Sequence, residues 1–204
     1  MTTIYLIRHA QSRPDPGQAE ADWPLSDVGT GQARGLVPIL HSLRLQRLYS
    51  SPFRRCRDTL DPFADESGLA LQFDDGLRER RIAGAWMQNF RDVWQRSWED
   101  FSFALDGGES SWTCRTRMAG AVESIARRHA GETIGLGSHG NAIALFLHYA
   151  DASVGIKEAR ALRTPEIVKV VHAEGRFTWD RSFTAGEALT RLATDFRETP
   201  GIVA

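Results

Sequence analysis

The chain has 204 residues, of which 42% are hydrophobic and 25% are charged, and its formal net charge is -1. This length suits one domain with one core, so we treat residues 1–204 as a single domain. Nucleic-acid-binding proteins usually carry a basic excess, so the charge argues against a nucleic-acid partner and leaves anion binding to a local cluster of arginines.

The first part of the chain alternates short apolar runs with helical segments. The run over residues 3–7 predicts a buried strand that ends at Arg8 and His9. A loop rich in Pro, Gly, Asp and Ser follows, and Ser26 or Asp27 can cap the next helix. Pro52 suits the first turn of a further helix. The pattern predicts strands over 48–50 and 69–73, and helices over 27–45 and 52–66.

An insertion over residues 76–108 differs from the rest because aromatic residues recur in it at helical spacing. The stripe consists of Trp86, Phe90, Trp94, Trp98 and Phe101. One interpretation is that this stripe packs a helical insertion onto the body, since aromatic side chains mostly serve burial. The other is that part of it forms a wall over a ligand pocket. Both can hold together.

The last part of the chain again alternates strands with helices. We expect a helix over 111–129, a strand over 133–138, a helix over 142–149, a hairpin of 166–173 with 176–182, and a short helix near 187–193. The whole pattern predicts an α/β fold: a three-layer sandwich with a mainly parallel central sheet flanked by helices, plus the short aromatic-rich insertion. Ligands of such sheets bind outside the carboxyl ends of the strands, where Arg8, His9 and His139 are expected.

Two features bear on location and partners. No apolar run approaches the ~20 residues that span a bilayer, so we expect no membrane partner. Cys56 and Cys114 lack CxxC spacing and predict neither a zinc site nor a disulfide, and the N-terminal pattern is not that of a signal peptide. The cytoplasm is the expected location, and a homodimer is left open.

Histidine and arginine side chains supply the chemistry at the predicted strand ends. A neutral imidazole is a good nucleophile toward phosphorus, and the guanidinium of Arg8, next to His9, matches phosphate oxygens bidentately. A second cluster holds Arg54, Arg55 and Arg57 at a strand-to-helix junction. Cations are unfavourable at a helix N-terminus, which suggests that at least one of these arginines serves a ligand.

Two further positions complete the set of candidates. Glu79 alone reads as an ordinary exposed carboxylate. His139 lies among small residues at a strand end, which implies close approach of backbone or ligand. His9 and His139 do not show metal-ligand spacing and have no carboxylate cluster beside them, so we expect no metal and no cofactor.

Together these segments resemble the histidine phosphatase superfamily, the phosphoglycerate mutase-like fold. The resemblance rests on LIRHAQS, PLSDVGTGQA, SSPFRRCRDT, LRE, GGES and GSHGN, which occur in the expected order over about two thirds of the chain. It implies that His9 is the nucleophile and forms a phosphohistidine, and that Glu79 is the acid/base. It further implies a site with His139 as a third catalytic residue, and a phosphate pocket of Arg8, Arg55, Ser12 and Gly140.

The chain departs from the family pattern at three positions. Ala10 replaces the usual glycine, which would matter only at a positive φ. Gln11 replaces a common acidic residue. Asp15 falls near a frequent asparagine, and because a carboxylate facing phosphate is unfavourable, we expect Asp15 to turn away or its loop to be rebuilt.

The predicted function is metal-independent hydrolysis of a small phosphorylated metabolite. A phosphoglycerate-type mutase is the first alternative, although the short insertion offers only Arg91 and Arg96 as extra cations. A catalytically lapsed protein that binds a phosphorylated ligand is the second. A phosphatase acting on phosphoproteins also stays open.

Overall fold

The chain folds, in a computed structural model, around one six-stranded sheet with the strand order β3-β2-β4-β1-β5-β6. The structure describes residues 1–84 and 87–194, and all statements below concern these residues. The strands are β1 (Thr2–Arg8), β2 (Arg47–Ser50), β3 (Leu71–Phe73), β4 (Thr133–Ser138), β5 (Glu166–Ala173) and β6 (Arg176–Trp179). Strands β1 to β4 run parallel, whereas β5 is antiparallel to β1 and β6 is antiparallel to β5.

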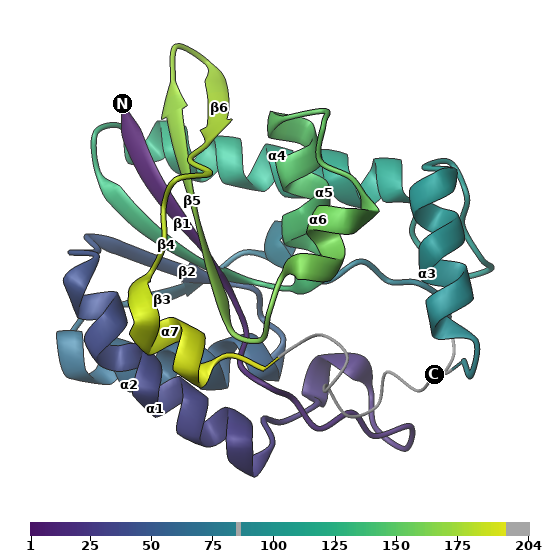
Figure 1. The fold of residues 1–204 in the computed structure, drawn as a ribbon, viewed down its shortest axis with the longest axis horizontal. Helices are drawn as coiled ribbons and strands as arrows, with labels where there is room; N and C mark the ends of the chain where they lie inside the picture. Colours follow the sequence, from purple (N-terminus) through teal and green to yellow (C-terminus); the bar gives the residue numbers. More distant parts are fainter. Residues whose placement is uncertain (85–86, 195–204) are drawn as a thin grey trace.

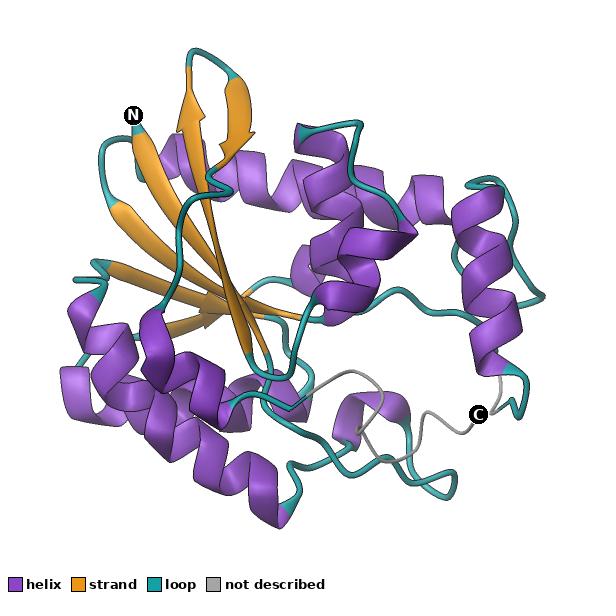
Figure 2. Cartoon of the chain, viewed as in Figure 1, coloured by secondary structure: helices purple, strands orange, loops and turns teal. Residues whose placement is uncertain are grey.

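Helices cover both faces of this sheet, as Figures 1 and 2 show. They are α1 (Asp27–Ser42), α2 (Arg54–Ser67), α3 (Phe90–Glu99), α4 (Ser111–Arg128), α5 (Gly140–Ala150), α6 (Ile156–Ala161) and α7 (Gly186–Leu192), with short 3-10 helices η1 (Glu20–Asp22) and η2 (Asp75–Leu77). One apolar core joins the sheet to α1, α2 and α7, and a larger one joins it to α4, α5 and α6. The expected three-layer α/β sandwich with a mainly parallel sheet is therefore confirmed.

Local sequence signals explain where several helices begin and end. The Ser26 hydroxyl accepts the N–H of Gly29 at 3.0 Å and caps α1. Helix α2 ends at Gly68, whose φ of 71° is the left-handed conformation that glycine adopts freely. Position 29 in the first turn of α1 requires glycine for packing, because a Cβ there would lie 1.9 Å from the carbonyl oxygen of Gln11.

Several details differ from the sequence prediction. Helix α2 begins at Arg54 and not at Pro52, because the Ser51 hydroxyl accepts the N–H of Phe53 and holds a turn before the helix. Strand β6 ends at Trp179, because the Asp180 carboxylate accepts the N–H and hydroxyl of Ser182 and makes a turn. Helix α6 was not expected, since its six residues are too few for a periodic pattern.

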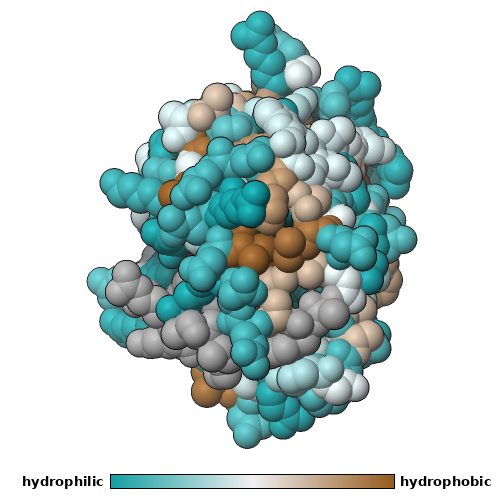
Figure 3. Space-filling view, turned by 90° about the vertical axis from the view of Figure 1, so that its right-hand side faces the viewer, coloured by the Kyte–Doolittle hydropathy of each residue, from teal (hydrophilic) through white to brown (hydrophobic). Residues whose placement is uncertain are grey.

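The aromatic stripe of the insertion packs onto the larger core. Trp94 is buried in that core, and Phe90, Trp98 and Phe101 pack against it. Trp86 lies outside the described residues. A cavity of about 230 Å³ separates α3 from α6 and is lined by Trp98, Phe101, His148, Val154, Ile156 and Arg160 among others. Figure 3 shows this side of the molecule, where an apolar patch is framed by hydrophilic residues. Helix α3 is thus a packed element, as the burial interpretation predicts.

No helix within the described ranges is long and apolar enough to cross a bilayer.

Candidate active site

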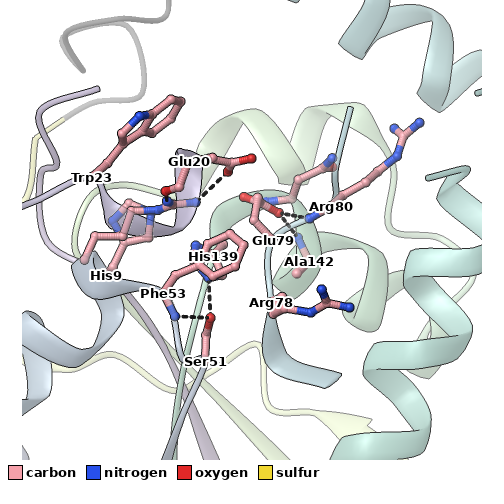
Figure 4. Close-up of polar contacts among 12 residues, drawn as sticks. His9, Glu20, Trp23, Ser51, Phe53, Arg78, Glu79, Arg80, His139 and Ala142 are labelled. Carbon is pink, nitrogen blue, oxygen red and sulfur yellow. Dashed lines mark hydrogen bonds and ion pairs between the residues drawn. The ribbon is translucent and has the colours of Figure 1, made fainter. Parts of the chain in front are cut away.

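The two histidines singled out in the sequence meet at the carboxyl ends of neighbouring strands. His9 follows β1, His139 follows β4, and the backbone N–H of His9 donates to the carbonyl of Ser138 at 3.0 Å. Their ring centroids lie 5.2 Å apart with the planes inclined by 64°. Figure 4 shows both rings in one region with Glu79. The parallel pairing of β1 with β4 therefore builds the centre of the site.

The imidazole of His9 is buried and is held in one tautomer by its neighbours. Its Nδ1 lies 2.7 Å from the carbonyl oxygen of Ala10, so we assign the proton to Nδ1. Its Nε2 accepts the Nε–H of Arg55 at 3.3 Å. Burial, followed by the charges of Arg55 and Arg8, holds the pKa of His9 well below its usual value. The ring is therefore neutral at neutral pH, with the lone pair on Nε2.

The guanidinium of Arg8 is buried at the end of β1. It donates to the carbonyl of Leu162 at 2.6 Å, which ties the site to the segment before β5. Burial is the main cause that lowers the pKa of Arg8 to about 10, so the side chain still carries its charge at neutral pH. Gly140 makes room for it, because a Cβ at that position would lie 2.8 Å from Cζ of Arg8.

Of the three arginines in the first turn of α2, only Arg55 points inward. Its side chain is 4% exposed, whereas Arg54 and Arg57 lie on the surface and pair with the carboxylate of Asp58. The guanidinium carbon of Arg55 lies 5.0 Å from the ring centroid of Phe53 and 5.6 Å from that of Trp23. The inward arginine is the one that the family pattern selects.

The carboxylate of Glu79 lies at the N-terminus of α5, between backbone donors. Its Oε1 accepts the N–H groups of Arg80 at 2.8 Å and Ala142 at 3.0 Å, and its Oε2 accepts that of Asn141 at 3.3 Å. Burial raises the pKa of Glu79, although these hydrogen bonds and Arg55 oppose the shift. A carboxyl group that stays protonated to higher pH than a free one suits a proton donor.

His139 is fully buried and contacts the side chains of Ser51 and Cys56, which lie before and after Arg55 in the chain. Its Nε2 lies 2.9 Å from the Ser51 hydroxyl and 3.4 Å from the Cys56 sulfur. Burial, then the charge of Arg55, lowers the pKa of His139 well below its usual value. Burial raises the pKa of Cys56 to about 12, so this thiol is not ionised at neutral pH.

The loop after β1 accommodates the departures from the family pattern. Ala10 is buried, is not among the residues with positive φ, and donates its N–H to Thr59 at 2.9 Å. The Gln11 side chain accepts the hydroxyl of Ser26 at 2.7 Å. The Asp15 carboxylate accepts the N–H of Gly17 and the amide of Gln18, so it serves its own loop. Ser12 is buried and forms an isolated β-bridge with Leu25.

Several residues of the site were not expected from the sequence. Glu20 binds Arg55 through both its backbone and its carboxylate, and Trp23 and Phe53 flank the same guanidinium. Ser51 lies in the SSP segment, so the resemblance of this motif to the family could have identified it. No sequence pattern marks Glu20, because a glutamate in a loop is ordinarily an exposed side chain.

The arrangement combines a neutral imidazole, two guanidinium groups and a carboxyl group with a raised pKa. Such a set can bind an anion, attack it and protonate a leaving group. No group of three or more His, Cys, Asp or Glu side chains suited to hold a metal ion occurs in residues 1–84 and 87–194.

The geometry agrees with comparisons to known proteins. The sequence profile of the histidine phosphatase superfamily (branch 1) matches residues 4–184. The chain belongs to this superfamily, and within it the chain is a histidine phosphatase, a phosphoric monoester hydrolase.

Its particular relatives include phosphatases and mutases. Phosphoserine phosphatase 1 of Hydrogenobacter thermophilus is 28% identical over 151 residues, which cover 68% of this chain and 71% of that protein. A probable phosphoglycerate mutase of Photorhabdus laumondii is 27% identical over 154 residues, covering 70% and 72%. A mycobacterial glucosyl-3-phosphoglycerate phosphatase solved with inorganic phosphate has the same fold, with a TM-score of 0.73 at 20% identity over 92% of this chain and 98% of that chain.

Proposed function

We propose that the chain hydrolyses a small phosphorylated metabolite through a phosphohistidine intermediate on His9. The observation that carries this proposal is the neutral His9, whose Nε2 lone pair is directed at the guanidinium of Arg55. A cation that contacts the nucleophilic atom also lies beside any phosphoryl group bound to that atom. One arginine can therefore bind the phosphate and stabilise the charge of the transferring group.

The proposed reaction has two steps. In the first, Nε2 of His9 attacks phosphorus, the ester P–O bond breaks, and Glu79 protonates the leaving alkoxide. In the second, the Glu79 carboxylate takes a proton from water, which attacks the phosphohistidine and releases inorganic phosphate. Arg8, Arg55 and His139 bind the phosphoryl oxygens, Gly140 acts by admitting the Arg8 guanidinium, and Ser12 is a secondary ligand.

Hydrolysis is favoured over the mutase reaction by the charges around the site. A mutase needs additional cations for the carboxylate and second phosphate of its substrate. Of the two basic residues of α3, Arg91 is exposed and the guanidinium of Arg96 stacks 4.2 Å from the ring centroid of Phe103. At the site itself, the carboxylate of Glu20 adds a negative charge next to Arg55.

The same proposal covers location and partners. Both cysteines are free and buried, which supports the cytoplasm. The partner is a small phosphorylated substrate, with no nucleic acid and no membrane, and with the oligomeric state open to a homodimer. We also predict that the reaction needs no metal ion, and assays in EDTA test this.

The test is hydrolysis of p-nitrophenyl phosphate in excess EDTA by the wild type, His9→Ala and His41→Ala. His41 is an exposed histidine that pairs with Glu66, so its variant controls for loss of an imidazole. We expect activity that survives EDTA, persists in His41→Ala and disappears in His9→Ala. More than a few per cent of activity in folded His9→Ala would exclude His9 as the nucleophile, and loss in EDTA would exclude the metal-free mechanism.

A further inference from the structure

Each of the three nitrogens of the Arg55 guanidinium donates a hydrogen bond to a group of the chain itself. Its Nε donates to His9 at 3.3 Å, and its two terminal nitrogens donate to the carbonyl and to the carboxylate of Glu20, each at 2.8 Å. The Arg55 side chain is 4% exposed and that of Glu20 is 36% exposed. The Glu20 carboxylate thus holds the place on Arg55 that an anionic ligand would take. Figure 4 shows Glu20 in the same region as His9 and Glu79.

A bound phosphate would change the balance of charge at this place. When a phosphate oxygen binds the terminal nitrogen of Arg55 that now donates to the Glu20 carboxylate, this carboxylate loses its cation and stays beside a dianion. Glu79 lies in the same electrostatic environment, since Glu20 adds to burial in raising the pKa of Glu79. A substrate that carries its own cation next to the phosphate ester would restore a partner for Glu20.

We propose that Glu20 is a specificity-determining residue that selects phosphate monoesters carrying an ammonium group a few bonds from the ester oxygen. This inference rests on the proposed phosphatase function and names its substrate class. The phosphate takes the donors of Arg55, and the displaced Glu20 carboxylate pairs with the ammonium group. Esters with a neutral or anionic group at that position leave the carboxylate without a cation, and they bind more weakly.

Neighbouring residues fix Glu20 at the position that this role needs. Glu20 begins the 3-10 helix η1, and its backbone carbonyl is bound to Arg55 independently of its side chain. The ring of Trp23, just after η1, stacks near the same guanidinium, and its Nε1 donates to the Asp15 carbonyl at 3.0 Å. The carboxylate can therefore leave Arg55 while the backbone contact keeps it at the mouth of the pocket.

The test compares two substrates of matched size, 2-aminoethyl phosphate and 2-hydroxyethyl phosphate, in the wild type, Glu20→Gln and Asp22→Asn. Asp22 is exposed on the same 3-10 helix, so its variant removes an equal charge at the same element. We expect the wild type to prefer the amino ester in kcat/KM. Glu20→Gln should reduce this preference about tenfold, the size of one charge-assisted contact, whereas Asp22→Asn should keep it.

A second measurement does not depend on turnover. Vanadate binding, followed by the melting temperature, should tighten in Glu20→Gln because the competing carboxylate is gone, and should stay unchanged in Asp22→Asn. The proposal is overturned if Glu20→Gln keeps the wild-type preference, if Asp22→Asn shifts it equally, or if vanadate binds no tighter to Glu20→Gln. Failure of the phosphatase function is a separate result: the wild type then hydrolyses neither ester, while the vanadate comparison still tests Glu20.

Discussion

The protonation states of two side chains, His9 and Glu79, set the pH range in which the proposed first step can run. The nucleophile must be neutral, and a lowered pKa keeps His9 neutral at pH values well below 6.5. The acid must be protonated, and a raised pKa keeps Glu79 protonated at pH values above 4.5. The value of kcat/KM should therefore rise with pH through the pKa of His9 and fall through that of Glu79.

Replacement of Glu79 by Gln should remove the falling part of this pH profile. The amide keeps the shape of the carboxyl group but cannot donate or accept a proton in the reaction. We expect a loss of about 10²–10⁴-fold in kcat for an alkyl phosphate and a much smaller loss for an aryl phosphate, whose leaving group needs no acid. Steady-state rates for both esters between pH 4 and 9 check this. Equal losses on the two esters would contradict the role of Glu79 as general acid.

Single residues also show how far sequence reasoning reaches. The structure brings His9, Arg8, Arg55 and His139 together, as their short motifs at strand ends indicate, and their roles stay predictions. The ordinary expectation for Glu79, an exposed surface carboxylate, was wrong, because the fold partly buries this side chain against the start of α5. Glu20 could not be foreseen, since its contact with Arg55 joins segments 35 residues apart and depends on the path of a loop.

One helix positions the segment that carries Glu79. Arg117 of α4 donates to the carbonyls of Gly76, Arg78 and Glu79, at 2.8, 3.1 and 3.4 Å. It also pairs with the Glu109 carboxylate at 2.7 Å, with both side chains 17% exposed. The GGES turn before α4 thereby supplies the anion that holds Arg117 in place. This contact is a structural reason for a glutamate at that position.

Truncation of Arg117 should affect both stability and the acid step. Arg117→Met leaves the Glu109 carboxylate partly buried without its cation, which should cost about 3 kcal/mol of unfolding free energy. The same variant should lower kcat more for alkyl than for aryl phosphates, because Glu79 loses its support. Arg117→Lys should recover part of both. Urea unfolding measures the loss of stability, and kcat for an alkyl and an aryl phosphate measures the effect on the acid step.

The matched control is Arg127→Met on the same helix. Arg127 is exposed and pairs with Glu123, so Arg127→Met should change neither the free energy of unfolding nor the kcat values by much. If Arg117→Met is less stable yet treats both classes of ester alike, Arg117 is structural and does not position the acid.

Helices and strands were predicted well where the pattern is long and less well where tertiary contacts decide. The core strands β1 and β4 follow from apolar runs, and the start of α1 follows from Ser26 as its cap. The cap of α4, Ser110, is seen in the structure. The start of α2 depended on the hydroxyl of Ser51, and α6 on its packing beside α5. Neither contact leaves a periodic signal in the sequence.

At the scale of the molecule, binding at the site should stabilise the whole fold. A ligand that binds only the folded state adds about 2.7 kcal/mol when present at one hundred times its dissociation constant. Vanadate, which mimics the transferring phosphoryl group, should therefore raise the melting temperature. Arg55→Ala should abolish this rise, and Arg54→Ala, one residue earlier on α2, should keep it because Arg54 faces the surface. A rise that survives in Arg55→Ala would place the anion elsewhere.

The position of β1 in the sheet has a consequence for the synthesis of the chain. This strand is made before both of its neighbours, because Thr3 pairs with Thr133 on one side and with Val171 on the other. At ribosomal rates of about 5–20 residues per second, both edges of β1 stay unpaired for several seconds or longer. An unpaired apolar strand is a template for aggregation, so a chaperone that covers β1 until β4 and β5 are made should raise the yield of folded protein.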